Sequence, residues 1–320
     1  MSIIERAVAK FEKSPQSASV ATQAGGLLES LVEAASFRRR APRLSATAAA
    51  APPYAPAARV KAGPAPPARE RISESGKTSR LIEINLARLM QAGMITPDNA
   101  KSQTAEEFRM IKRPLLQNAL AQGESAIENG NLIMLTSALP KEGKTHCAIN
   151  LAMSIAMEMD YRVLLVDADV ARPSMPERLG FDGGRGLMDV LLDNKIDLAD
   201  VMLRTNVEKL TLLPAGRGHR YATEILASEA MSRMIAELAR RYRDRIIIFD
   251  SPPLLVTTEA RVLASHMGQV VIVVEAGKTT QESLKEAMQH VDGIPFVGTV
   301  FNKGDPQSAG YYGRYFGYGS

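Results

Sequence analysis

Residues 131–152 read NLIMLTSALPKEGKTHCAINLA, and their pattern indicates the fold more clearly than any other part of the chain. It opens with an uninterrupted apolar run, passes through a short loop containing proline and glycine, and continues with apolar residues at helical spacing. The loop matches the pattern GxxxxGK[ST] at Gly143, Lys144 and Thr145, whereas Ala138 stands where the pattern has its first glycine. A buried strand, a phosphate-binding loop and a helix are therefore predicted in that order.

Such a loop binds nucleotide phosphates for electrostatic reasons. Its backbone N–H groups and the N-terminus of the following helix point at the phosphates, and a helix N-terminus favours negative charge. Lys144 is expected to reach the β- and γ-phosphate oxygens, and the Thr145 hydroxyl to ligate Mg²⁺. The residues that we expect around the nucleotide are Pro140, Lys141, Glu142, Gly143, Lys144, Thr145 and His146.

Five further apolar runs follow or flank helical stretches. They are continuous rather than alternating, which is typical of strands that helices cover on both faces. We therefore expect an α/β fold with a doubly wound, mostly parallel sheet, in which ligands bind beyond the carboxyl ends of the strands. The six predicted strands are 131–137, 162–169, 210–216, 245–251, 269–276 and 296–302.

Carboxylates stand at the ends of two of these strands. Asp167 and Asp169 are two residues apart in LLVDADVARPS, so in an extended chain they point the same way. Asp250 follows four apolar residues in IIIFDSPP, the pattern of a Walker B strand whose acid orients Mg²⁺ through water. All three are predicted at the phosphate end of the nucleotide, with Asp169 and Asp250 near the metal.

Some residues near these motifs remain open to two interpretations. Asn302 ends the strand FVGTVFN, where its amide could recognise the edge of a purine or cap a turn. Arg172 could meet phosphate or face solvent. Cys147 lies in the helix after the phosphate loop and is interpreted as a packing residue rather than a nucleophile.

Composition narrows the class of protein. The chain has 320 residues, of which 45% are hydrophobic and 23% charged, as in globular proteins. One cysteine excludes an internal disulfide and suits a reducing compartment. No apolar run approaches the roughly 20 residues that cross a bilayer, and no signal-peptide core or nucleic-acid motif is found. We expect a cytoplasmic protein that does not bind nucleic acid.

Charge is unevenly distributed along the chain. Residues 1–80 hold 13 Lys and Arg against 6 Asp and Glu, whereas the remaining residues hold 26 against 29. The basic part could attract an anionic membrane surface or an acidic partner, or could serve as a solvated tether.

Patterning divides the chain into five segments. Residues 41–70 contain 12 alanines and 7 prolines, which favour an extended linker over a core. The segments are a short helical segment at 1–40, the Ala/Pro-rich linker at 41–79, a helical oligomerisation segment at 80–130, a phosphate-loop domain at 131–305 and a tyrosine-rich tail at 306–320.

Two helices are predicted before the phosphate loop. The first spans 80–93 and ends at Gly93. The second begins with a capping box formed by Thr104 and Glu107, and Pro114 should kink or restart it.

The chain ends in GYYGRYFGYGS, residues 310–320. Half of its eight tyrosines lie there, at Tyr311, Tyr312, Tyr315 and Tyr318, separated by glycines that disfavour a packed helix. The tail is either an adhesive segment without chemistry or a set of phosphoacceptors.

Three motifs in order, ALPKEGKT, LLVDADVARPS and IIIFDSPP, followed by the tyrosine-rich end, resemble the bacterial tyrosine kinases of exopolysaccharide and capsule assembly. The resemblance covers about residues 100–320. The N-terminal part further resembles the stand-alone autokinases of exosortase-linked exopolysaccharide loci. The resemblance implies a P-loop NTPase fold with deviant Walker motifs, ATP and Mg²⁺ as cofactors, and autophosphorylation of the tail tyrosines in trans.

The same resemblance implies roles for individual residues and for partners. Lys144, Asp167, Asp169 and Asp250 fall on the catalytic positions, with Asp167 our choice for the proton acceptor. The family signature ExxRxx[KR] for ring assembly falls on Glu106, Arg109 and Lys112. The implied partners are further copies of the chain, a separate membrane-spanning polysaccharide co-polymerase or chain-length protein that activates the kinase, and a tyrosine phosphatase.

Other functions remain open on the sequence alone. Positioning ATPases of the ParA/MinD kind share the deviant Walker motifs but usually carry a lysine where this chain has Leu139. A nucleotide-driven assembly switch, or an ATPase whose tail docks a partner, would also use the phosphate loop. Only the kinase requires tyrosine phosphate.

Overall fold

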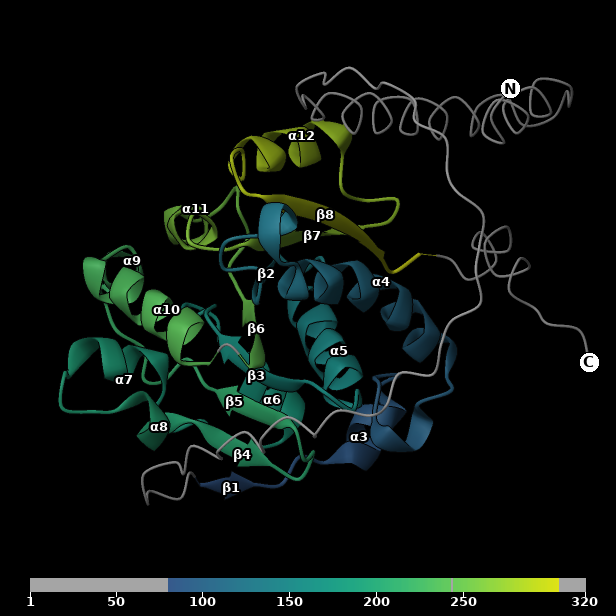
Figure 1. The fold of residues 1–320 in the computed structure, drawn as a ribbon, viewed down its shortest axis with the longest axis horizontal. Coiled ribbons are helices and arrows are strands. Elements are labelled where there is room, and N and C mark those ends of the chain that lie inside the picture. Colours follow the sequence, from purple (N-terminus) through teal and green to yellow (C-terminus); the bar gives the residue numbers. More distant parts are fainter. Residues whose placement is uncertain (1–79, 243, 305–320) are drawn as a thin grey trace, which may run out of the picture. The chain divides into compact units, whose positions relative to one another are not determined.

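The computed structural model describes residues 80–242 and 244–304. The helical segment predicted at 1–40, the linker at 41–79 and the four tail tyrosines lie outside the described residues. The described part contains an eight-stranded sheet with helices on both faces (Figure 1).

The strand order of the sheet is β1-β4-β5-β3-β6-β2-β7-β8. Every pair of neighbours is parallel except β4 and β5. The predicted doubly wound, mostly parallel sheet is therefore confirmed. The strands are β1 (Leu81–Ile82), β2 (Leu132–Ser137), β3 (Arg162–Asp167), β4 (Leu203–Thr205), β5 (Leu210–Leu213), β6 (Arg245–Asp250), β7 (Gln269–Glu275) and β8 (Phe296–Asn302).

All six predicted strands are present, and the sequence missed the two short ones, β1 and β4. The helix predicted over 80–93 is wrong at its start, because its first residues form β1 and pair with β4. Asn206 holds the chain extended after β1, since its side chain bonds both the N–H and the C=O of Ile84. Asn85 then caps the helix that follows. Strands of two or three residues are too short to leave a readable period in the sequence.

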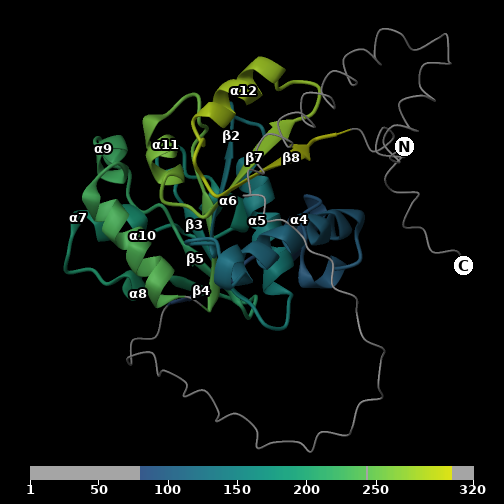
Figure 2. The ribbon, with the colours of Figure 1, turned by 45° about the horizontal axis from the view of Figure 1, so that its top comes forward.

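The helices form two layers, one on each face of the sheet, and Figures 1 and 2 show the same separation. One layer contains α3 (Leu86–Gln91), α4 (Gln103–Leu120), α5 (Lys144–Ala156) and α6 (Met175–Leu179). The other contains α7 (Leu187–Leu192), α8 (Leu198–Val201), α9 (Ala222–Leu226), α10 (Glu229–Arg241), α11 (Thr258–Ala264) and α12 (Gln281–Gln289).

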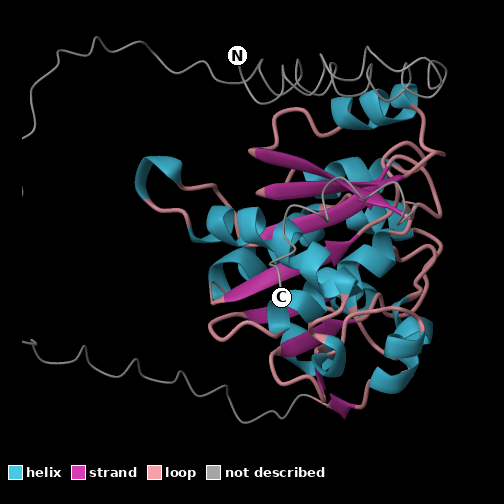
Figure 3. Cartoon of the chain, turned by 90° about the vertical axis from the view of Figure 1, so that its right-hand side faces the viewer, coloured by secondary structure: helices cyan, strands magenta, loops and turns pink. Residues whose placement is uncertain are grey.

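Successive strand residues serve the two cores in turn. In β2, Leu132 and Met134 pack with the α7–α12 layer, whereas Ile133 and Leu135 pack with the α3–α6 layer. Because both faces of the strand are covered, every one of its residues is buried. The continuous apolar runs in the sequence have this origin, and Figure 3 shows the strands running through the domain between helices.

The second predicted helix is α4, and it begins earlier than expected. Its N-cap is Ser102, whose hydroxyl accepts a hydrogen bond from the backbone N–H of Ala105 at 3.2 Å, so the predicted capping box at Thr104 is wrong. Ser102 has the extended backbone that an N-cap needs, while Thr104 already lies in the first turn. Pro114 lies inside α4, and the helix continues through it without a restart.

Candidate active site

The carboxyl ends of three adjacent strands, β3, β6 and β2, bring the predicted residues together. Asp167 ends β3 and Asp250 ends β6, and these two residues lie opposite each other in the strand register. Beyond β2, the phosphate loop leads to Lys144, the first residue of α5. The Lys144 ammonium lies 3.7 Å from the nearer carboxylate oxygen of Asp169. Segments far apart in sequence thus meet because the sheet order places them side by side.

The backbone of the phosphate loop explains which of its residues must be small. Gly143 has φ +103°, and a Cβ there would lie 2.0 Å from the side-chain nitrogen of Asn302. Lys141 also adopts a positive φ, of +70°. Ala138 needs no left-handed backbone and its methyl group is buried in the core, so alanine can replace the first glycine of the pattern.

A buried carboxylate inside the loop fixes its shape. Glu142 is 3% exposed, and its carboxylate accepts hydrogen bonds from the backbone N–H of Leu139, at 2.8 Å, and from the hydroxyl of Thr279. Thr279 belongs to the segment between β7 and α12. The loop is therefore held in position by a different part of the chain rather than by its own residues alone.

The end of β8 holds the same loop from the other side. The Asn302 amide donates to the backbone carbonyl of Glu142 at 2.9 Å, and the Lys303 ammonium donates to that of Lys141 at 2.7 Å. Neither interpretation of Asn302 from the sequence anticipated this contact. These two hydrogen bonds organise the loop before a phosphate binds, which lowers the entropic cost of binding it.

Two of the three carboxylates are buried and have oxygens without a hydrogen-bond partner. Asp167 is 0% exposed and neither of its carboxylate oxygens has a partner, while Asp250 is 1% exposed and one of its oxygens has none. Burying a carboxylate without compensation is costly, so such oxygens are the acceptors that a cation or a proton would satisfy.

Burial changes the acidity of all three groups. It raises the pKa of Asp250 to about 6, although the nearby Thr145 hydroxyl and Lys144 ammonium act in the opposite direction. It also raises the pKa of Asp167 well above its usual value, and the negative charges of Asp250 and Asp169 add to this shift. The pKa of Asp169 rises because of burial and is moderated mainly by Lys144. The site therefore favours positive charge among its carboxylates.

A pH dependence of stability follows for the protein without metal or nucleotide. The pKa of Asp250 is raised from 3.8 to about 6, so between these values the folded state keeps a proton that the unfolded state has already lost. The contribution of Asp250 to the free energy of unfolding therefore decreases as pH rises from 4 to 6. As pH rises from 4 to 6, the free energy of unfolding of Asp250→Asn should therefore increase by about 3 kcal/mol relative to that of the unmodified chain. Urea unfolding of both proteins in EDTA measures the difference, and parallel stability curves would contradict it.

A cavity of about 730 Å³ opens in front of these residues. Its lining combines basic side chains with prolines and a valine from the segment after β6. Of the three carboxylates, Asp169 lines the cavity. The lining also includes Lys141, Lys144, Thr145, His146, Arg172, Ser174, Arg178, Pro252, Pro253, Val256, Asn302 and Lys303.

Sequence reasoning missed several members of this site. The Ser174 hydroxyl lies 3.3 Å from that of Thr145, and the Arg178 guanidinium lies 3.4 Å from Ser174, so α6 and its N-cap contribute to the wall. Ser174 is the last residue of the second motif, LLVDADVARPS, and could have been found from it. Thr279 left no signal, because its partner Glu142 lies 137 positions away.

Burial changes the acidity of two residues that follow Thr145 in the first turn of α5. Burial, with the charge of Asp250, raises the pKa of the Cys147 thiol to about 12, so it stays protonated at neutral pH and packs in the core. Burial, with the charge of Arg178, lowers the pKa of His146, which favours its neutral form at the cavity wall.

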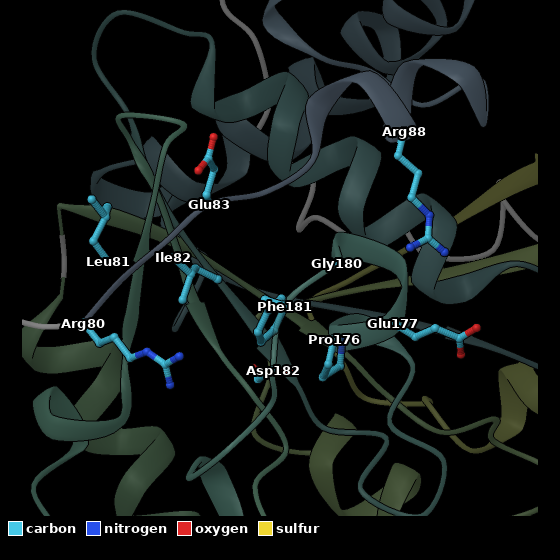
Figure 4. A pocket seen from close by; sticks show the side chains of 10 residues that line it. All are labelled: Arg80, Leu81, Ile82, Glu83, Arg88, Pro176, Glu177, Gly180, Phe181 and Asp182. Carbon is cyan, nitrogen blue, oxygen red and sulfur yellow. The ribbon is translucent and has the colours of Figure 1, made fainter.

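A second hollow, of about 520 Å³, lies on the other side of α6 beside β1 (Figure 4). Its charged residues are of both signs, namely Arg80, Arg88, Glu83, Glu177 and Asp182. It therefore lacks the excess of positive charge and the phosphate loop that distinguish the first cavity. Phosphates are better accommodated in the first cavity.

The three residues of the assembly signature lie on α4 in two environments. Glu106 and Arg109 pair with each other, and their side chains are 57% and 39% exposed. The Lys112 side chain is 5% exposed, and its ammonium lies 2.6 Å from the carbonyl of Ser154 and 2.7 Å from the carboxylate of Glu158. Lys112 thus compensates the negative end of α5 within its own domain, and its burial does not fit the expected contact with a neighbouring copy.

Known proteins match the chain across this site. A family model described as an AAA domain matches residues 141–296. The tyrosine-protein kinase CpsD of Streptococcus agalactiae is 31% identical over 195 residues, which are 60% of this chain and 83% of CpsD. The tyrosine-protein kinase Wzc of Salmonella typhimurium is 29% identical over 250 residues, which are 77% of this chain but 33% of Wzc. The chain therefore spans about a third of the length of that relative.

A solved structure agrees with these relatives. The kinase domain of the Escherichia coli tyrosine kinase ETK superimposes with a TM-score of 0.57 at 28% identity, over 64% of this chain and 77% of that domain. With the phosphate loop, the gathered carboxylates and a sheet of the same fold, the chain belongs to the bacterial tyrosine-protein kinase family.

Proposed function

We propose that the chain is a protein-tyrosine autokinase that transfers the γ-phosphoryl group of ATP to its own C-terminal tyrosines and thereby regulates the polymerisation or export of an exopolysaccharide. The observation that carries the proposal is the position of Lys144 beside Asp169 at the mouth of a preorganised phosphate loop, in a member of this kinase family. The tyrosine cluster at residues 311–318 supplies the acceptors.

ATP would lie in the cavity of about 730 Å³. The backbone N–H groups of Gly143, Lys144 and Thr145 at the start of α5 would hold the phosphates, and the Lys144 ammonium would contact the β- and γ-oxygens. Arg172 and Arg178 add positive charge to the wall. The base would lie toward Asn302 at the end of β8, away from the carboxylates.

The donor set fits a magnesium ion. Thr145, Asp169 and Asp250 would hold it, directly or through water, and the unpartnered oxygen of Asp250 is available for this. Within the described residues no three His, Cys, Asp or Glu side chains form a complete cage, as is usual for an ion that shares phosphate oxygens and water. When bound, magnesium neutralises charge on the β- and γ-phosphate oxygens.

In the transfer, the phenolic oxygen of a tail tyrosine forms a bond to the γ-phosphorus. The bond between this phosphorus and the oxygen bridging to the β-phosphorus breaks, and ADP leaves with the electron pair. Asp167 would take the phenolic proton, because both of its oxygens lack a hydrogen-bond partner and burial raises its pKa. Lys144 would stabilise the charge of the transferring group.

The acceptor tail would come from a neighbouring copy in a ring. Glu106 and Arg109, exposed on α4, are the residues we propose at the contact between copies. Each phosphate adds a charge of about −1.5 to −2 at neutral pH, so phosphorylated tails would repel one another and disfavour the ring.

A separate membrane-spanning polysaccharide co-polymerase or chain-length protein would activate the kinase, and a tyrosine phosphatase would reset it. In the described part of the chain no helix combines the length and apolarity of a membrane crossing. We propose that the protein lies in the cytoplasm, at the inner face of the plasma membrane through this membrane-spanning partner, and the basic residues within 1–80 would add attraction to that anionic face.

Intact mass spectrometry of the full chain with ATP and Mg²⁺, followed by mapping of the tail peptide, tests this function. Mass steps of one phosphate on the tail tyrosines are expected, and light scattering of the same sample should show an oligomer that dissociates on phosphorylation. Binding of nucleotide without any tyrosine phosphate, even with a cytoplasmic segment of the co-polymerase added, would favour a nucleotide-driven assembly switch instead.

A further inference from the structure

Two large aliphatic side chains are exposed beside the phosphate loop. Leu139, in the loop itself, is 38% exposed, and Val256, in the segment after β6, is 58% exposed. Val256 lines the nucleotide cavity together with Pro252 and Pro253. Apolar surface at the mouth of a polar cavity marks a place where an apolar group of a ligand can bind.

Hydrogen bonds hold the two loops next to each other. The backbone N–H groups of Leu254 and Leu255 donate to the carbonyls of Ser137 and Ala138, at 2.8 and 3.2 Å. This pairing continues the contact of β6 with β2 beyond the ends of both strands. Leu139 follows directly on one side and Val256 on the other, so the two exposed side chains belong to adjoining segments. We call Leu139, Pro253 and Val256 the apolar rim; Pro253, which is largely buried, and Val256 line the cavity, and Leu139 lies in the adjoining loop.

The rim lies at the end of the cavity where phosphoryl transfer would occur. The metal-binding candidates come from β3 and β6, whereas Asn302 comes from β8, on the far side of β2 in the sheet. The segment carrying Pro253 and Val256 follows Asp250 of β6 directly. A group resting on this rim is therefore next to the γ-phosphate rather than next to the base.

We propose that this apolar rim seats the phenol ring of the acceptor tyrosine, and that its occupant is the tail segment 310–318 of this chain. The proposal rests on the autokinase function proposed above. The segment after Gly304 carries only two charged side chains, Asp305 and Arg314, together with five aromatic rings. Its sixteen residues reach at most about 55 Å when fully extended, and this is the length over which a tail could enter the cavity of a neighbouring copy.

The rim also explains why tyrosine would be selected over serine or threonine. An aromatic ring buries much more apolar area than a short hydroxyl side chain, and it carries its hydroxyl outward from the rim toward the phosphate. Leu139, Pro253 and Val256 would thus determine specificity for the acceptor, without contributing to phosphate binding.

The test uses shape-conserving changes, Leu139→Asn and Val256→Thr, alone and combined. The acceptor is the full chain carrying Lys144→Met, and its tail phosphorylation by each enzyme is measured against acceptor concentration. The double variant is expected to raise the KM for this acceptor roughly tenfold, with an unchanged Kd for a fluorescent ADP and an unchanged melting temperature. Met159→Gln, at an 83% exposed position between α5 and β3, is the matched control and should leave the acceptor KM unchanged.

Other outcomes separate the possible occupants. A weaker affinity for ADP with an unchanged acceptor KM would mean that the rim holds the nucleotide base, and no change in either would leave the rim without a role; both would overturn the proposal. If the unmodified chain makes no tyrosine phosphate, the autokinase function fails, and binding of a labelled peptide of residues 305–320 to the ADP-loaded protein still tests the rim. Equal peptide affinity for the unmodified chain and the double variant would overturn it.

Discussion

Replacing Lys144 with methionine is expected to lower the rate of tail phosphorylation by a factor of about 1,000 or more. The Lys144 side chain is 9% exposed and its ammonium lies 3.7 Å from the Asp169 carboxylate, so it acts in a site where little water screens its charge. Its loss removes the cation that stabilises the transferring phosphoryl group. It also removes a charge that lowers the pKa of both Asp169 and Asp250, so both carboxylates would be harder to ionise.

The measurement is the initial rate of phosphate incorporation into the tail, read by intact mass. Lys278→Met is the matched control, because this lysine is 70% exposed, pairs with Glu275 and does not line the cavity. It should change the rate by less than about twofold. A Lys144→Met protein that kept a tenth of the normal rate would contradict the assigned role.

Asp167→Asn is expected to have two opposite effects, on rate and on stability. The rate should decrease by a factor of about 100 to 10,000, since the amide cannot accept the phenolic proton. Without metal and nucleotide, the variant should be more stable than the unmodified chain at pH 7 by about 2 kcal/mol or more, because a buried carboxylate with two unpartnered oxygens has been neutralised. The sign follows from its raised pKa, which makes ionisation at neutral pH unfavourable in the folded state.

Asp169→Asn is the comparison that distinguishes a proton acceptor from a metal-binding group. Asp169 lines the cavity and lies near Lys144. Its replacement should therefore weaken Mg²⁺ binding and raise the Mg²⁺ concentration needed for half-maximal rate, while the pH dependence of the rate should stay in place. For Asp167→Asn, the ascending part of the pH–rate profile should disappear. If Asp167→Asn kept the full rate with intact nucleotide binding, the proton would be accepted elsewhere.

Together these changes would separate stability from function within one site. Carboxylates that cost folding free energy in the free protein would contribute to catalysis once phosphate and cation are bound. Such a conflict between stability and activity is common where charged groups are gathered for chemistry.

Local chemistry along the chain was enough to predict much of this protein. Five of the six predicted strands were readable because they are largely buried on both faces, which requires an uninterrupted apolar run, whereas the edge strand β8 is only half-buried yet keeps an apolar sequence. The phosphate loop and its following helix were readable because glycine, lysine and threonine are needed at fixed spacing there. Asp167 and Asp250 were readable because each ends such a run.

Other features depend on contacts between distant segments and could not be predicted from the sequence. The β1 strand exists only through its pairing with β4, and the sequence of residues 80–93 by itself favours a helix. From the sequence, Glu142 was predicted only as one of the loop residues around the nucleotide. In the structure its buried carboxylate accepts a hydrogen bond from the distant Thr279. Lys112 carries the family signature, but the neighbouring end of α5 decides that it points inward.

Local periodicity and the spacing of particular side chains were enough to predict the order of the long strands and helices, the phosphate loop and the acidic ends of the strands. Contacts between distant segments, in contrast, explain how Thr279, Asn302 and Lys303 hold the loop and why basic and apolar side chains gather around one cavity. The physical reason is that sheet order sets which strand ends are neighbours, and burial then decides which charges need a partner.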